Sequence, residues 1–194
     1  ARQYYQMTSL LIKAKVDFNA LCDQVLPGMQ ELMSDHAGRH KLSDFVLRYH
    51  HTTHILEMGE TRFRKDYCKW AEKKGYRNCE RMAVLIFATA QNGIPVLPNA
   101  PSTQIVITEA IRVLHTVEAS RDAILTQMQA LAKTLPEYSL VREMPCIGDT
   151  LAPRLIAEIG DVRRFHSKRA LIAYAGIDAP PYQSGKFRSL PAIE

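Results

Sequence analysis

The sequence predicts a mainly α-helical protein. Apolar residues recur at helical spacing in several segments, and no convincing strand pattern appears before Ala170. The longest periodic segment, from about Ser102 to Leu135, keeps its apolar residues close to heptad spacing. A very short turn near Gly148 then separates two further helical patterns. We therefore expect a helical region, a long coiled-coil helix, and a domain that contains a helix-hairpin-helix.

Composition limits the class of protein. A chain of 194 residues that is 46% hydrophobic can bury the core of one or two small domains. Its formal charge of +5 favours an anionic partner without establishing one. The four cysteines are irregularly spaced, and the sequence has neither a secretory leader nor an apolar run of membrane-spanning length. These features predict a cytoplasmic protein with no membrane partner and, because the first residue is not Met, a fragment of a longer chain.

The first 101 residues are expected to form several helices. The first should run from about Gln3 to Leu26 and end at Pro27 and Gly28. A second helix should follow Ser43, and another should cover residues 77–91. A connector rich in helix breakers comes after it. The predicted buried face of the first helix comprises Leu10, Leu11, Ala14, Phe18, Leu21, Cys22 and Val25.

A basic segment within this region has two interpretations. Residues 62–81 hold eight Lys or Arg against three acids, interleaved with Tyr67, Trp70 and Tyr76. The aromatic rings could stack on bases in a nucleic-acid groove. Alternatively, the segment is a solvated basic helix whose Tyr67 and Trp70 face inward. The second interpretation is favoured.

No metal site is predicted within the chain. His50, His51 and His54 have a spacing that a metal could use on a helix, and Cys68 and Cys79 lie downstream. Zinc ligands usually show tighter paired spacing than this. An ordinary histidine cluster is therefore favoured. The aspartates of the N-terminal region are dispersed and do not form the carboxylate pair of a two-metal nuclease.

The long helix carries a narrow apolar seam that needs a partner helix. The partner can belong to another subunit, which would give a homodimer or higher homo-oligomer through residues 102–135, or it can fold back within the chain. Arg121 at a seam position weakens the first possibility. Pro136 should end the helix. The seam comprises Ile107, Ile111, Leu114, Val117, Arg121, Ile124, Met128, Leu131 and Leu135.

The turn near Gly148 is the strongest candidate for nucleic-acid contact. The amides at the start of the helix that follows it form a ready phosphate site. Cys146 stands where such hairpins usually have Gly, so its Cβ should hold a phosphate slightly further away, and Asp149 should repel one. A purely structural helical hairpin is the alternative. The predicted nucleic-acid-binding residues are Ile147, Gly148, Thr150, Arg163, Arg164, Lys168, Arg169 and Lys186.

A serine near the end of the chain is a candidate nucleophile. Ser184 precedes Gly185 in a basic loop, where its hydroxyl could attack phosphorus while Lys186 and Arg188 stabilise the developing charge. A simple linker is the commoner meaning of a Ser-Gly pair.

The order of these elements resembles one transposase family, the bacterial insertion-sequence transposases of the "IS one-ten" group, relatives of the Piv invertase. The motifs that carry the resemblance are Leu-Val-Arg-Glu-Met-Pro-Cys-Ile-Gly at 140–148, Ala-Glu-Ile-Gly-Asp at 157–161, Arg-Phe at 164–165, Ala-Tyr-Ala-Gly-Ile at 173–177 and Gln-Ser-Gly at 183–185. The resemblance implies that Ser184 is a nucleophile that becomes linked to DNA. It also implies a RuvC-like domain whose four acids bind divalent metal (Mg²⁺), and in some members a guide RNA.

The chain departs from that family at both ends. The acidic domain should precede Ala1, and the family's Gly-rich, basic continuation should follow Lys186. We expect a fragment that is inactive alone, with a helical region over 1–101, a coiled-coil helix over 102–135, and the start of the serine-bearing domain over 136–194. Its parent protein would cleave and rejoin DNA strands during transposition. The rival predictions are a non-catalytic helix-hairpin-helix module that binds DNA and a coiled-coil adaptor.

Overall fold

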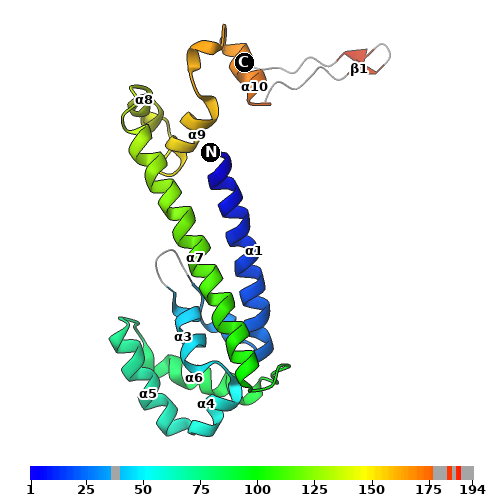
Figure 1. The fold of residues 1–194 in the computed structure, drawn as a ribbon, viewed down its shortest axis with the longest axis vertical. Coiled ribbons are helices and arrows are strands. Elements are labelled where there is room, and N and C mark those ends of the chain that lie inside the picture. Colours follow the sequence, from blue (N-terminus) through cyan, green and yellow to red (C-terminus); the bar gives the residue numbers. More distant parts are fainter. Residues whose placement is uncertain (36–39, 177–182, 185–186, 189–194) are drawn as a thin grey trace. The chain divides into compact units, whose positions relative to one another are not determined.

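The computed structural model describes residues 1–35, 40–176, 183–184 and 187–188, and it is mainly α (Figure 1). It divides into two compact units, residues 1–127 and residues 128–194. The helices are α1 (Arg2–Val25), α2 (Met29–Leu32), α3 (Lys41–Tyr49), α4 (Thr52–Met58), α5 (Glu60–Lys73), α6 (Cys79–Asn92), α7 (Pro101–Ala132), α8 (Glu137–Glu143), α9 (Leu151–Ile159), the 3₁₀ turn η1 (Val162–Arg164) and α10 (Lys168–Tyr174). Two short strands, β1 (Gln183–Ser184) and β2 (Phe187–Arg188), form an antiparallel pair.

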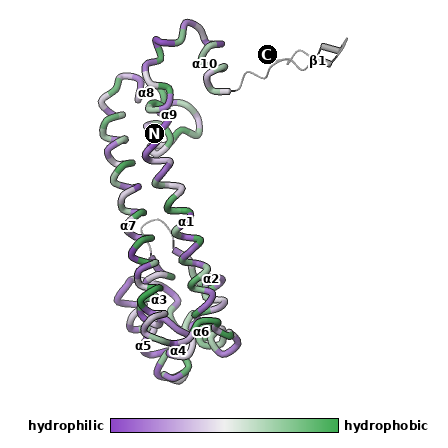
Figure 2. The backbone as a smooth tube through the Cα atoms, turned by 45° about the vertical axis from the view of Figure 1, so that its right-hand side comes forward, coloured by the Kyte–Doolittle hydropathy of each residue, from purple (hydrophilic) through white to green (hydrophobic). Residues whose placement is uncertain are grey.

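In the first unit, α1 and the N-terminal part of α7 run side by side in opposite directions (Figures 1 and 2). Phe18 of α1 and Leu114 of α7 belong to one buried cluster, and each is 2% exposed. The predicted helix over residues 3–26 is confirmed by α1. One member of its predicted buried face is wrong, because Leu10 is 49% exposed and Leu11 takes the inward position beside it.

Helices α3 to α6 surround a cluster of aromatic rings. The Tyr49 ring lies 5.2 Å from that of Phe63 and 6.2 Å from that of Trp70, centroid to centroid, and all three side chains are buried. Tyr67 is 1% exposed and belongs to the same cluster. The interpretation of α5 as a basic helix with its aromatic residues turned inward is therefore confirmed. Tyr67 and Trp70 are not available to stack on bases.

The seam of α7 is partly filled from within the chain. Ile107, Ile111 and Leu114 are each 2% exposed in the core of the first unit. A second copy of the chain therefore could not pack on these three residues, and oligomerisation through the rest of the seam stays a prediction. Arg121 at its seam position lies against Glu118, with Nη2 and Oε1 3.8 Å apart.

The end of α7 differs from the sequence expectation. The helix stops at Ala132, four residues before Pro136, and tight turns follow in which the Leu135 amide donates to the Ala132 carbonyl (3.0 Å). Pro136 instead precedes the first residue of α8 with φ of −62°, a value that suits a helix start. Pro136 thus begins the next helix and does not end the long one.

The second unit packs the last turns of α7, α8, α9 and α10 around an apolar pocket of about 660 Å³. The side chains of Leu140, Met144 and Leu171 are among those that line it. Among the described residues, no helix is long and apolar enough to cross a bilayer.

Candidate nucleic-acid interface

A short exposed turn joins α8 to α9, as the sequence predicts. The Ile147 amide donates to the Met144 carbonyl (3.3 Å), and the Gly148 carbonyl accepts the Leu151 and Ala152 amides at 3.1 and 3.0 Å. These bonds close the turn and start α9. Whether the pair is a member of the helix-hairpin-helix class stays a prediction.

Three successive amides of this turn remain available. The N–H groups of Gly148, Asp149 and Thr150 donate no hydrogen bond within the described part of the chain, and all three residues are exposed. Thr150 precedes α9, so these donors lie at the positive end of the helix dipole. Unpaired N–H groups at a helix start suit a phosphate oxygen.

The carboxylate in the turn is held by two neighbours from α8. Asp149 Oδ1 lies 2.9 Å from Arg142 Nε and accepts a hydrogen bond from the Tyr138 hydroxyl (3.1 Å). Arg142 also donates to the Ile147 carbonyl. The expected repulsion of phosphate by Asp149 is thus offset by an arginine on the same side of the turn. Arg142 is a site residue that the sequence prediction missed, because its ion pair forms only once the turn brings residues seven apart together.

The backbone explains why glycine is usual where this chain has Cys146. Cys146 adopts φ of +66°, in the left-handed region that costs a residue with a Cβ about 1–2 kcal/mol. Gly148 shows the opposite behaviour. Its φ is not in that region, and a Cβ placed on it would meet nothing within 4 Å. Packing within the described chain therefore does not require glycine at 148. A partner that approaches the backbone closely at this position would require it.

The predicted basic residues lie on η1 and α10. Arg163 Nε is 3.5 Å from Asp161 Oδ1, and the Arg164 guanidinium lies over the rings of Phe165 and Tyr174, 4.6 Å from each centroid. Lys168 and Arg169 are exposed in the first turn of α10 and form no ion pair within the described ranges. Two cations at the positive end of a helix are locally unfavourable, so an anionic partner would relieve them.

The candidate nucleophile lies on the two-stranded ladder. Ser184 pairs with Phe187, and Gln183 with Arg188. The predicted contact residue Lys186 falls between the two strands and outside the described residues. The structure gives the backbone conformation at Ser184 and leaves its catalytic role a prediction.

The histidine cluster at 50–54 has a structural role at His51. Its Nδ1 accepts the Thr53 amide at the start of α4 (3.1 Å), and its Nε2 lies 3.0 Å from the Leu97 carbonyl oxygen. Both ring nitrogens are therefore occupied. The rings of His50 and His54 stack at 4.9 Å, and burial followed by the charge of His54 lowers the pKa of His50.

Comparison with known proteins gives two matches. Residues 138–193 match the model of the family described as Transposase IS116/IS110/IS902. The chain is also 23% identical over 165 residues to the "Insertion element IS110 uncharacterized 43.6 kDa protein" of Streptomyces coelicolor, over 85% of this chain and 40% of that protein. The chain thus spans about two fifths of the length of this relative. No solved structure matches the chain.

Proposed function

Because the chain belongs, through its residues 138–193, to the IS116/IS110/IS902 transposase family, we propose that it is the part of a transposase that holds DNA beside a serine nucleophile. Its function is related to transposition. The matched region contains both the turn with three free amides and Ser184. The exposed, unpaired amides of Gly148, Asp149 and Thr150 are the observation on which the proposal depends most.

In this proposal the turn binds the sugar-phosphate backbone without reading its sequence. Amides at 148–150 donate to phosphate oxygens, and Lys168 and Arg169 add long-range attraction. Arg142 keeps the carboxylate of Asp149 from opposing the approach. Such contacts fix the register of the duplex, which is the requirement for presenting one phosphodiester to a nucleophile.

The chemical step is assigned to Ser184. Its hydroxyl loses a proton to solvent, and its oxygen forms an ester bond to phosphorus. The bond from phosphorus to a deoxyribose oxygen breaks, and that oxygen takes up a proton from solvent and leaves as a free hydroxyl. The acidic domain expected before residue 1 would supply the divalent metal that stabilises the charge on the phosphate. We propose DNA binding for the chain alone and strand cleavage for a protein that also carries those acids. A guide RNA and pairing of subunits belong to the same proposal.

The experiment uses the intact protein with a DNA substrate that carries the ends of its own element. Ser184→Ala should abolish strand cleavage and the covalent protein–DNA product while DNA affinity is kept. Ser189→Ala, five residues further along, is the matched control and should cleave like the wild type. Cleavage by Ser184→Ala at the wild-type rate would overturn the assignment of the nucleophile.

A further inference from the structure

Three potential metal ligands from separate segments meet in the first unit. Asp35 follows α2, His40 immediately precedes α3, and His115 lies on α7. One ligand atom from each lies within 4.8 Å of the other two, and all three residues are half-buried. We propose that Asp35, His40 and His115 bind one divalent transition-metal ion of the zinc class.

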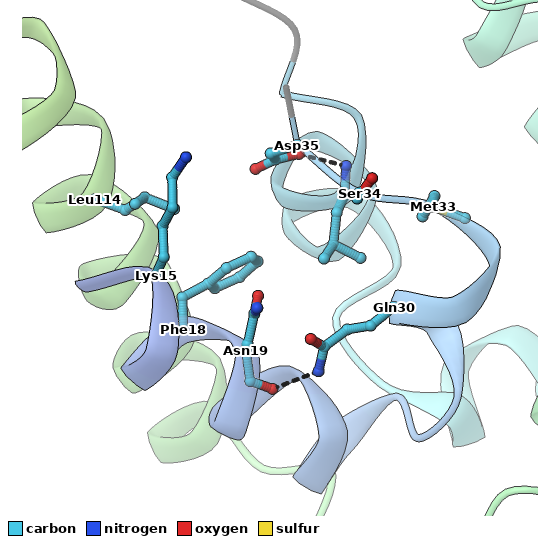
Figure 3. A pocket seen from close by; sticks show the side chains of 9 residues that line it. Lys15, Phe18, Asn19, Gln30, Met33, Ser34, Asp35 and Leu114 are labelled. Atoms are coloured by element: carbon cyan, nitrogen blue, oxygen red, sulfur yellow. Dashed lines mark hydrogen bonds between the residues drawn. The ribbon is translucent and has the colours of Figure 1, made fainter. Parts of the chain in front are cut away.

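The hydrogen bonds around Asp35 leave one of its oxygens free for a metal. Oδ1 accepts the amides of Leu42 and Ser43 at 2.7 and 3.2 Å, which caps the start of α3. Oδ2 is buried and has no hydrogen-bond partner. Figure 3 shows Asp35 at the edge of a pocket of about 240 Å³ that Leu114 of α7 also lines. A buried carboxylate oxygen without a partner is costly, and a bound cation would remove that cost.

The two histidines are held in a way that leaves a ring nitrogen free on each. The Ser43 hydroxyl donates to the His40 carbonyl (3.3 Å), and in the Nε2–H tautomer of His115 it accepts from that nitrogen (3.1 Å). This tautomer leaves the lone pair of His115 Nδ1 free. On His40, the buried Nδ1 has no hydrogen bond, and its nearest acid is Glu118, with Oε2 3.7 Å away. A hydroxyl behind a metal-binding histidine, as that of Ser43 lies behind His115, is the usual supporting arrangement.

The electrostatics favour a cation over two protonated imidazoles. The rings of His40 and His115 are 4.3 Å apart, so two protonated imidazoles would repel each other. Neutral imidazole is the form that binds metal. The carboxylates of Asp35, Glu118 and Asp44 lie near His115. The cations near these carboxylates include Arg121 beside Glu118, Lys15 on the pocket wall, and Lys74, whose Nζ lies 2.8 Å from Asp44 Oδ2.

The donor set fits zinc better than magnesium or calcium. Two imidazole nitrogens and one carboxylate oxygen suit a tetrahedral zinc whose fourth ligand is water, whereas the hard cations take mostly oxygen. Tetrahedral zinc places its ligand atoms about 3.3 Å apart. From separations of at most 4.8 Å, the three ligand atoms would therefore close by up to about 1.5 Å on binding. The ion would tie Asp35 and His40 to α7, which gives it a structural role independent of the transposase chemistry.

The test is calorimetric titration of the EDTA-stripped chain with zinc chloride. Wild type should bind one zinc ion, and zinc should raise its melting temperature. Asp35→Asn and His115→Gln, which keep the hydrogen bonds of the apo form, should lose the site. Ser43→Ala, which removes only the support of His115, should bind zinc about 10–100-fold more weakly.

The controls separate this site from other histidines and from misfolding. His54→Gln and the exposed His166→Gln should bind zinc like the wild type. Melting curves recorded in EDTA check that each variant folds without metal. Absence of zinc binding in wild type would overturn the proposal, and so would full wild-type affinity in folded Asp35→Asn and His115→Gln.

Discussion

Arg142 on α8 and Asp149 in the following turn form an ion pair, with Nε and Oδ1 2.9 Å apart. This pair places a neutralised carboxylate next to three unpaired amides at the start of α9. An isolated carboxylate there would repel phosphate, so the proposed phosphate site depends on the arginine as well as on the backbone.

Removing Arg142 should therefore weaken DNA binding by unmasking Asp149. We expect Arg142→Ala to lower duplex affinity roughly tenfold, equivalent to about 1.4 kcal/mol. Arg112→Ala, which breaks an exposed ion pair with Glu109 in the first unit, is the control of equal charge change. Fluorescence anisotropy with a labelled duplex measures both.

The double variant Arg142→Ala/Asp149→Asn distinguishes unmasking from removal of a direct bond to phosphate. Affinity should recover most of the way when the carboxylate is also removed. No recovery would mean that Arg142 binds phosphate itself.

The two cations of α10 should contribute through long-range attraction. Replacing Lys168 and Arg169 by Ala should weaken binding and make log affinity depend less steeply on log salt, with the slope smaller by about one for each phosphate that is no longer neutralised. Lys65 and Lys69, exposed on α5, provide the matched double variant in the first unit. Equal slopes for the two double variants would show that α10 has no special part in binding.

The conformation of Cys146 predicts a stabilising substitution. Cys146→Gly should relieve the strain of the left-handed backbone conformation. Glycine also loses more backbone entropy on folding, so the net rise in the free energy of unfolding should be roughly 0.5–1 kcal/mol. Cys146→Ala keeps a Cβ at the same φ and should give no gain. Urea denaturation followed by circular dichroism compares the three proteins.

An ion pair in the first unit predicts a pH-dependent stability. Asp66 accepts hydrogen bonds from Arg48 Nη2 (2.8 Å) and from the buried Tyr49 hydroxyl (2.8 Å). Burial raises its pKa, but these bonds outweigh burial and lower it below the ordinary 3.8. The stabilisation is thus fully present above pH 3.8 and is lost as pH falls through the lowered pKa of the folded state.

Asp66→Asn should destabilise the protein at neutral pH by about 1 kcal/mol, because the pair is half-exposed and partly screened. The difference from wild type should shrink below pH 3.8. Denaturation curves at a series of pH values measure it, with Glu109→Gln at an exposed pair as control. A difference that stays constant with pH would contradict this account.

The sequence predicted best where a local rule decides the outcome. The apolar period and Pro27 located α1, and the short turn near Gly148 located α8 and α9, since each depends on neighbours within one or two helical turns. It was wrong where local preferences allow two outcomes. Leu10 and Leu11 lie on adjacent faces that tertiary packing alone can choose between, and Pro136 suits either the end of one helix or the start of the next.

Features that depend on residues far apart had no sequence signal. His115 meets Asp35 and His40 only because α7 packs along the first unit, so no spacing rule could connect them. The apolar spacing along α7 likewise could not identify the helix that packs on the seam. Ile107, Ile111 and Leu114 would have the same spacing whether they faced α1 or a second subunit.

DNA binding by Gly148→Val tests the phosphate-site account most directly. A Cβ at this position meets no described atom within 4 Å and adopts no strained φ, so the variant should melt like the wild type. The control Ala130→Val, at an exposed position on α7, should do the same. We predict that Gly148→Val lowers duplex affinity at least tenfold, whereas Ala130→Val leaves it unchanged. Wild-type affinity in correctly folded Gly148→Val would contradict the account.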